Sequence, residues 1–303
     1  MTTIKRYCFI ILISGISFTA TAQKPGAGEL FRSSVFTPLN SFTSGVEGPA
    51  VDKSGILYAV NFEHDSTIGR ILPNGIGKIF LKLPNGSIGN GLRFNNRGDM
   101  LIADYTNHNI LKVDMSTKQI QIFAHEPGMN QPNDIAIDSK DRLYASDPNW
   151  KDSTGSIWRV DLNGKVTLLE ENMGTANGIE VSPDEKTLYV NESVQRKVWA
   201  YHLSNGNISN KRLLIEFPDH ELDGMRCDIK GNLYIARYGK GTIIKVSPGG
   251  KILKEITLTG KNPSNVAFGG KDGCTVYVTV QDNGNIETFR VDTPGREWKM
   301  IRK

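Results

Sequence analysis

The chain has 303 residues, of which 38% are apolar and 22% are charged, and its mean hydropathy is −0.32. These values exclude a disordered chain and a membrane protein with several spans. The 36 basic and 32 acidic residues give a net charge of +4, without a lysine- and arginine-rich run that could follow a phosphate backbone. We therefore expect no nucleic-acid partner, and the length allows one large β domain.

The N-terminus has the pattern of a secretory signal peptide. Lys5 and Arg6 precede an apolar stretch over residues 7–18, and Ala20-Thr21-Ala22 forms an A-x-A cleavage site. The apolar stretch is shorter than the roughly 20 residues that span a bilayer. We therefore predict a signal peptide over 1–22, cleavage after Ala22, and a secreted or periplasmic domain over 23–303 with no membrane partner. A single-span anchor or a lipid-modified Cys8 is the alternative.

Cleavage would leave Cys227 and Cys274, which are far apart and match no metal-binding spacing. Two separate, buried thiols are expected. An oxidising compartment would still permit one bridge between them if they met.

One pattern occurs six times in the predicted mature chain. A polar residue opens a short apolar run, a turn follows, and a second apolar pair such as Leu57-Tyr58 or Leu188-Tyr189 comes ten to twelve residues later. A third run with period two and a weaker fourth run complete each unit. Successive openings are 43, 43, 44, 46 and 41 residues apart, and they fall at Glu47, Asn90, Asn133, Asn177, Asp223 and Ser264.

Four short strands in about 43 residues are typical of one propeller blade. Six such units predict an all-β fold, a six-bladed β-propeller with four-stranded antiparallel blades. Closure into a ring would remove the exposed edges of an open row of sheets. We expect the segment around residues 36–42 to add an outer strand to the last blade and so latch the ring.

The opening residues should form a ring of side chains at one mouth of the central channel. All six carry oxygen, and two of them, Glu47 and Asp223, are carboxylates. Asn-Gly and Asp-Gly are also common turn pairs, so turn chemistry is the alternative explanation. Two like charges in a narrow channel repel each other, and a bound cation would relieve this. An all-oxygen donor set favours Ca²⁺, although Mg²⁺ or another divalent cation is possible.

The ends of the second strands should return to the same face of the ring. This geometry places four charged side chains around the mouth as candidate substrate contacts or as residues that orient the ligands: Asp104, Asp147, Glu192 and Arg237. Asn90, the ring member of the second blade, is a further candidate for substrate binding.

Blade-specific motifs resemble those of a known family. They include Glu47-Gly48-Pro49, Pro132-Asn133-Asp134, Ala176-Asn177-Gly178-Ile179 and Leu222-Asp223-Gly224-Met225. The chain resembles the regucalcin and gluconolactonase family of six-bladed propellers, which includes luciferin-regenerating enzyme. The resemblance implies that Glu47, Asn133, Asn177 and Asp223 bind a divalent cation and that Asp223 is the acid/base residue.

The resemblance also implies a reaction. The cation would polarise the carbonyl of a lactone, and water activated by Asp223 or by the metal would attack it. Gln131 stands where animal regucalcin has an arginine that contacts the sugar, so it is the candidate substrate contact at that position, and gluconolactone itself is a weaker prediction than lactone hydrolysis.

The predicted function is therefore that of a secreted, Ca²⁺-dependent, monomeric lactonase acting on a small molecule. Two alternatives remain open. Residues 99–113 and 141–160 also resemble NHL-type repeats, which favours a non-catalytic binding propeller. The same metal site could instead hydrolyse phosphotriesters or fluorophosphates.

Overall fold

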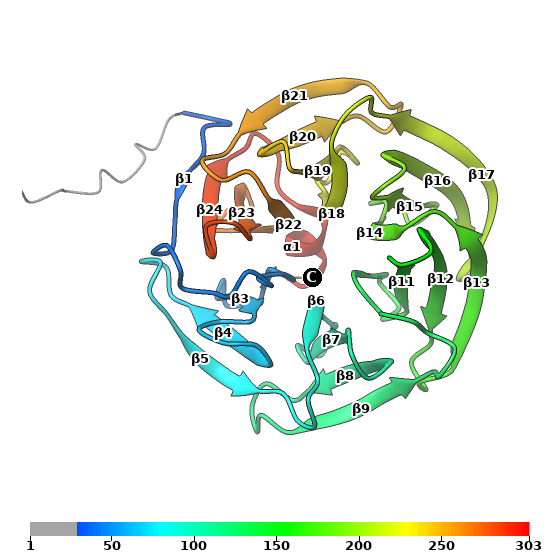
Figure 1. The fold of residues 1–303 in the computed structure, drawn as a ribbon, viewed down its shortest axis with the longest axis horizontal. Helices are drawn as coiled ribbons and strands as arrows, with labels where there is room; N and C mark the ends of the chain where they lie inside the picture. Colours follow the sequence, from blue (N-terminus) through cyan, green and yellow to red (C-terminus); the bar gives the residue numbers. More distant parts are fainter. Residues whose placement is uncertain (1–28, 303) are drawn as a thin grey trace, which may run out of the picture.

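Six four-stranded antiparallel sheets make up the computed structural model, which describes residues 29–302. The sheets stand around a central axis as the blades of a propeller (Figure 1). The predicted fold class is therefore confirmed. The predicted signal peptide, 1–22, lies outside the described residues.

Each blade runs from an inner strand at the axis to an outer strand at the rim. The first three blades contain β2 (Ala50–Val51), β3 (Leu57–Val60), β4 (Thr67–Ile71) and β5 (Gly77–Lys82); β6 (Gly89–Phe94), β7 (Met100–Asp104), β8 (Asn109–Val113) and β9 (Ile120–His125); and β10 (Ile135–Ile137), β11 (Leu143–Asn149), β12 (Thr154–Val160) and β13 (Val166–Met173).

The other three blades follow the same order, and the last one takes its outer strand from the N-terminus. They contain β14 (Ala176–Val181), β15 (Thr187–Glu192), β16 (Lys197–Ser204) and β17 (Asn207–Glu216); β18 (Glu221–Cys227), β19 (Leu233–Tyr238), β20 (Thr242–Val246) and β21 (Ile252–Thr257); and β22 (Pro263–Gly269), β23 (Thr275–Val280), β24 (Asn285–Arg290) and β1 (Ser34–Val35).

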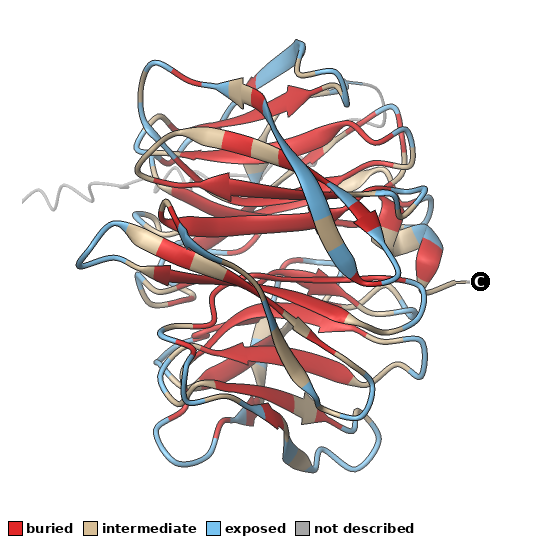
Figure 2. Cartoon of the chain, turned by 90° about the vertical axis from the view of Figure 1, so that its right-hand side faces the viewer, coloured by how far each residue is buried: buried red, intermediate tan, exposed pale blue. Residues whose placement is uncertain are grey.

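Burial explains the apolar runs in the sequence. The second strand of a blade is covered on both faces by the neighbouring blades, so all residues of β3 and β7 are buried, whereas the outer strand β9 is partly exposed. Figure 2 shows the buried middle of the blades and the exposed loops and rim. A buried hydrophobic cluster lies at each of the six blade interfaces, including the one between the last blade and the first. The same apolar burial therefore stabilises every interface.

The ring is closed by the N-terminal segment, as predicted, but the strand lies earlier in the chain than residues 36–42. Ser34 and Val35 of β1 pair with Thr288 and Glu287 of β24. Residues 36–42 continue along the last blade through backbone hydrogen bonds without forming a regular strand. Segments near the two ends of the chain thus share one sheet, which fastens the last blade to the segment that leads into the first.

A short helix covers the end of the channel opposite the predicted mouth. Helix α1 (Arg296–Met300) lies near the axis of the ring (Figure 1). Arg296 donates a hydrogen bond to the carbonyl of Ile137, at the C-terminal end of the inner strand β10, at 2.9 Å. The sequence analysis predicted no helix because five residues are too few to show a helical period. Among the described residues, no helix is long and apolar enough to cross a membrane.

The two cysteines do not pair. Cys227 is buried at the interface of the fourth and fifth blades, and Cys274 packs at the edge of the cluster between the fifth and sixth. Within residues 29–302 both are free thiols, so they are separate as expected and form no bridge, but Cys274 is only partly buried, contrary to the expectation that both would be buried.

Thr37 allows a test of the ring closure. Its buried hydroxyl accepts a hydrogen bond from the backbone N–H of Ile286 at 2.8 Å. We expect Thr37→Val, which keeps the shape but leaves this N–H unpaired, to lower the free energy of unfolding by about 1–3 kcal/mol. Urea denaturation measures the loss. Thr257→Val, on the exposed side of β21, is the control, and an equal change in both variants would contradict this role for Thr37.

Candidate metal and active site

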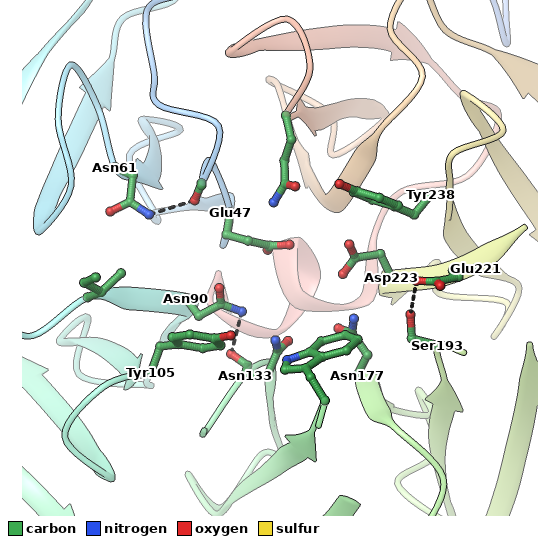
Figure 3. A pocket seen from close by; sticks show the side chains of 14 residues that line it. Glu47, Asn61, Asn90, Tyr105, Asn133, Asn177, Ser193, Glu221, Asp223 and Tyr238 are labelled. Atoms are coloured by element: carbon green, nitrogen blue, oxygen red, sulfur yellow. Dashed lines mark hydrogen bonds between the residues drawn. The ribbon is translucent and has the colours of Figure 1, made fainter. Parts of the chain in front are cut away.

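Five of the six predicted ring residues line one cavity at the mouth of the channel (Figure 3). The cavity has a volume of about 400 Å³. Its deep part is lined by Glu47, Asn90, Asn133, Asn177 and Asp223. The other lining residues complete the wall: Gly45, Asn61, Ile88, Tyr105, Trp150, Ser193, Glu221, Tyr238 and Gln281.

The sixth ring residue, Ser264, does not line the cavity. Its side chain is fully buried, and its hydroxyl donates a hydrogen bond to the carbonyl of Val46 at 2.8 Å. Ser264 therefore ties the last blade to the residue before Glu47. The sequence analysis predicted that Ser264 would line the channel mouth like the other five residues, and this is wrong. The side chain of Ser264 is short, and its hydroxyl bonds to the Val46 carbonyl instead of facing the cavity.

The predicted contacts Asp104 and Asp147 are buried and point away from the cavity. Asp104 accepts hydrogen bonds from Ser87 and Asn109 at 2.8 and 2.9 Å. Asp147 accepts one from the Trp158 indole N–H at 2.9 Å, and burial raises its pKa. Both carboxylates hold loops within their own blade.

Gln131, Glu192 and Arg237 do not line the cavity either. The backbone N–H of Gln131 donates to the carboxylate of Asp147 at 2.6 Å, and Glu192 accepts from the Gly174 N–H at 2.9 Å. Arg237 is buried, and its guanidinium pairs with Asp219 at 2.7 Å. The prediction that Glu192 and Arg237 surround the mouth is therefore wrong, whereas Gln131, a candidate from the resemblance alone, has its side chain beside Tyr105 of the cavity wall.

The error is a shift by one residue. Successive side chains of a strand point to opposite faces, so a buried charged residue and the residue that follows it have different surroundings. Tyr105, Ser193 and Tyr238 line the cavity directly after Asp104, Glu192 and Arg237. The sequence signal that could have found them is this alternation at the end of the second strand.

Glu47 is the first of two carboxylates in the deep part of the cavity. Only 5% of the residue is exposed. Its Oε2 accepts hydrogen bonds from the Gly48 N–H at 2.8 Å and from the Asn265 amide at 3.1 Å. Desolvation nonetheless raises the pKa of Glu47 to about 7, with a further contribution from the charge of Asp134.

Asp223 is the second carboxylate, and its environment also disfavours its charge. Desolvation and the charge of Glu47 raise the pKa of Asp223 well above its usual range. Hydrogen bonds from Asn177 and from the Gly224 N–H, which donates to Oδ1 at 3.0 Å, partly oppose this shift. The two carboxylates therefore repel each other.

Close backbone packing fixes the ring residues in place. Gly48 has a φ of +53°, and a Cβ atom there would collide with the carbonyl of Asn90. Only glycine fits this position, which explains the Glu-Gly pair of the first blade. Asn191 donates to the carbonyl of Asp223 at 2.6 Å and accepts from the Gly178 N–H at 3.1 Å. Asn191 had not been identified from the sequence, because nothing in its strand marks it as different.

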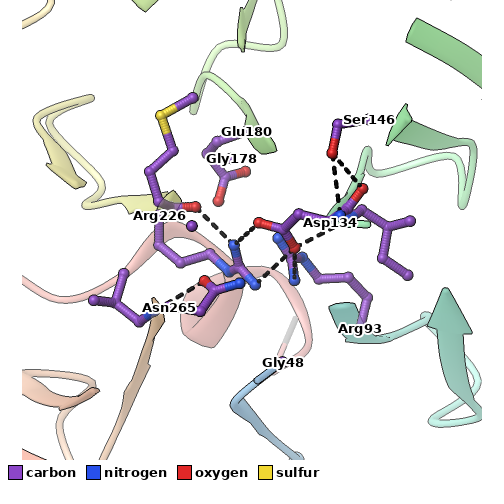
Figure 4. A network of polar contacts seen from close by, with 12 residues as sticks. Gly48, Arg93, Asp134, Ser146, Gly178, Glu180, Arg226 and Asn265 are labelled. Carbon is purple, nitrogen blue, oxygen red and sulfur yellow. Dashed lines mark hydrogen bonds and ion pairs between the residues drawn. The ribbon is translucent and has the colours of Figure 1, made fainter. Parts of the chain in front are cut away.

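A buried ionic network lies beneath the carboxylates (Figure 4). Asp134 accepts a hydrogen bond from Arg226 at 2.8 Å and lies 3.5 Å from Arg93. The carboxylate of Glu297, from α1, is 2.7 Å from Arg93 and 3.8 Å from Arg226. Arg296 of the same helix lies 3.5 Å from Glu180. Each buried charge in this network thus has a partner of opposite sign. Because the positive charges are already paired within the network, they do not neutralise the negative charges of Glu47 and Asp223 at the mouth.

The residues of the mouth fit a hard divalent cation. The Oδ1 atom of Asn177 is buried without a hydrogen-bond partner, which is costly unless a cation or water takes the position. Two carboxylates and the amides of Asn133 and Asn177 provide oxygen donors from four blades. Within residues 29–302, no three histidine, cysteine, aspartate or glutamate side chains cluster in a metal-binding arrangement. A cation here would therefore depend on amide oxygens.

Fold and site together define a class: six-bladed propellers with an oxygen-lined polar cavity at one end of the channel. The sequence profile of the SGL family, described as the SMP-30/gluconolactonase/LRE-like region, matches residues 45–282. The chain belongs to this family.

Two curated relatives show the range of the similarity. A gluconolactonase from Zymomonas mobilis is 28% identical over 289 residues, which cover 82% of this chain and 80% of that protein. A 6-deoxy-6-sulfogluconolactonase from Pseudomonas putida is 30% identical over 154 residues, covering 48% of this chain and 53% of that protein. The chain thus spans about half the length of the second relative.

Among solved structures, regucalcin from Agrobacterium tumefaciens, described as a calcium-binding protein, has a TM-score of 0.75 at 22% identity. The match covers 86% of this chain and 97% of that one. At this identity the likeness concerns the fold alone.

The raised pKa of Glu47 predicts how stability depends on pH in the cation-free protein. An unfolded glutamate titrates near its model value of 4.5, and the folded one titrates at about 7. The stabilisation from binding this proton is complete below pH 4.5 and is lost as the pH rises through about 7.

We therefore expect the free energy of unfolding of cation-free protein to fall between pH 5 and pH 8. Glu47→Gln should flatten this dependence and exceed the wild type at pH 8 by about 2 kcal/mol. Chemical denaturation in EDTA across this range measures it, and Glu171→Gln on the exposed side of β13 is the control. Identical slopes for wild type and Glu47→Gln would contradict the raised pKa of Glu47.

Proposed function

We propose that this protein hydrolyses small lactones with the help of a divalent cation, with Ca²⁺ as the preferred ion. The observation that carries the proposal is the pair of mutually repelling carboxylates beside the unpartnered oxygen of Asn177. Membership of the family and the lactonase names of its relatives support the reaction class. A sugar lactone such as gluconolactone is the finer expectation.

Glu47, Asn133, Asn177 and Asp223 would hold the cation. When bound, it would polarise the ester carbonyl and stabilise the negative charge that develops on the carbonyl oxygen. The hydrogen bonds to Glu47 from Gly48 and Asn265 orient one of its oxygens. This leaves the other oxygen, Oε1, for the cation.

Asp223 is the residue that we assign to proton transfer. Its Oδ1 accepts the Gly224 N–H and keeps a second lone pair that could bind the cation, so Oδ2 is the atom that would accept a proton from the attacking water. The remaining hydroxide adds to the carbonyl carbon, the bond between this carbon and the ring oxygen breaks, and the ring oxygen receives the proton that Asp223 took from the water. Burial makes Asp223 a stronger base than an ordinary aspartate, although a nearby cation opposes this effect.

The remaining cavity wall suits a small, polar substrate. Tyr105, Trp150 and Tyr238 offer aromatic faces with polar edges, and Gln281 offers a neutral amide. A volume of about 400 Å³ lies within the range of small-molecule sites. We propose that the protein acts as a monomer, which gel filtration would test.

Calorimetry with Ca²⁺ on the purified protein, followed by a panel of lactones on the same samples, tests the proposal. We expect Asp223→Asn to lose at least tenfold in Ca²⁺ affinity and at least a hundredfold in kcat, because it removes a charged ligand and the proton acceptor. EDTA should abolish hydrolysis and Ca²⁺ should restore it. Asp114→Asn, on an exposed turn between β8 and β9, is the matched control.

Two outcomes would overturn the proposal. If the wild type binds no divalent cation and hydrolyses no lactone, the polar ring residues only stabilise turns. The non-catalytic binding propeller then replaces the lactonase as the proposed function. If it binds a cation but hydrolyses phosphotriesters and no lactones, the site is correct and the substrate class is wrong.

We also propose that the chain is exported, on the basis of the basic start, the apolar stretch and the Ala20-Thr21-Ala22 motif. Expression of the full chain in a bacterial host should give a periplasmic or secreted protein whose first residue is Gln23. Intact mass and cell fractionation measure this. An uncleaved or lipid-modified chain in the membrane fraction would support the anchor alternative instead.

A further inference from the structure

The charges of the cavity wall are all negative. The residues that line it include Glu47, Asp223 and Glu221, and no lysine, arginine or histidine of the part that the structure describes is among them. A divalent cation would balance the first two carboxylates. Glu221 would then be the uncompensated charge facing a bound substrate.

Glu221 stands at the mouth of the cavity on the same strand as the proposed catalytic residue. It opens β18, two residues before Asp223, and both residues line the cavity although the register of the strand shifts between Leu222 and Met225. Its Oε2 accepts a hydrogen bond from Ser193 at 3.4 Å, and both residues line the cavity (Figure 3). The carboxylate is exposed to the region that a substrate must enter.

The nearest cations on the same blade are engaged elsewhere. Arg237 pairs with Asp219 at 2.7 Å, and Lys240 pairs with Glu255 at 3.0 Å. Within residues 29–302, no ion pair joins Glu221 to a basic side chain. The negative potential at the mouth is therefore not cancelled locally.

We propose that Glu221 is a specificity-determining residue that disfavours lactones with an anionic substituent, so that this protein selects uncharged lactones. This inference rests on the proposed lactonase function. A like charge placed against the substrate discriminates by repulsion rather than by better contacts with the preferred ligand. It would separate this protein from its Pseudomonas relative, whose name describes a sulfonated lactone.

A matched pair of substrates isolates the charge. D-Glucono-1,4-lactone and D-glucaro-1,4-lactone share their ring and differ at C6, which is a hydroxymethyl group in the first and a carboxylate in the second. We expect the Ca²⁺-loaded wild type to have a kcat/KM at least tenfold higher for the neutral lactone. Glu221→Gln should reduce this ratio about fivefold, and Glu221→Lys should reduce it further.

Ionic strength and a control variant complete the design. The ratio in the wild type should decrease as NaCl rises from 20 to 500 mM, because salt screens an exposed charge. Glu216→Gln, an exposed position on β17 outside the cavity, should keep the wild-type ratio and salt dependence. A merely structural role of Glu221 would change kcat/KM for both lactones equally and leave their ratio constant.

The inference fails if the wild type hydrolyses both lactones equally well, or if Glu221→Gln leaves their ratio unchanged. If neither lactone is hydrolysed, the proposed function fails for these substrates. Calorimetric binding of the same two lactones then tests Glu221 separately. At least tenfold tighter binding of the neutral lactone, reduced in Glu221→Gln, supports the charge selection, and equal binding overturns it.

Discussion

The inner edges of the six sheets all face one axis, and this constraint shapes the rest of the molecule. An inner strand has no further strand to pair with, so its free backbone groups must find partners in the neighbouring blade. Gly91 donates to the carbonyl of Asn133 at 2.8 Å, and Asn191 donates to the carbonyl of Asp223 at 2.6 Å. Such contacts bind each blade to the next at the axis. They also explain why the channel is lined by small and amide-bearing residues.

The channel is organised in layers of charge. Glu47 and Asp223 lie at the mouth, the network around Asp134 and Arg226 lies beneath them, and α1 covers the far end. The charges of the lower layer are paired within it, so only a small part of its potential reaches the mouth, where Arg226 lowers the pKa of Glu47 slightly. The ionic layer excludes water from below without removing the repulsion above. The cavity is thereby prepared for a ligand of opposite charge, at a cost in the stability of the empty protein.

Much of the candidate site could be predicted from the sequence because the repeat has a constant register. Residues at equivalent positions of successive blades must lie on one ring, so Glu47 and Asp223 could be brought together although 176 residues separate them. The same argument failed at the ends of the second strands. A shift of one residue moves a side chain to the other face, and Asp104 and Arg237 are buried between blades for that reason. The polarity of a residue did not show whether its side chain faces the cavity or forms hydrogen bonds that stabilise a loop.

The sequence by itself determined the number of blades, their strand order and the ring of oxygen-bearing residues, because these follow from local periodicity and from the spacing of the repeats. Only the tertiary structure decided which polar residues face the cavity, since Ser264 and Asp147 satisfy backbone and indole groups that are brought near them by folding. Helix α1, the position of β1 and the unpaired charge of Glu221 also emerged only in three dimensions. Each depends on contacts between segments far apart in the chain, and the local sequence pattern does not predict such contacts.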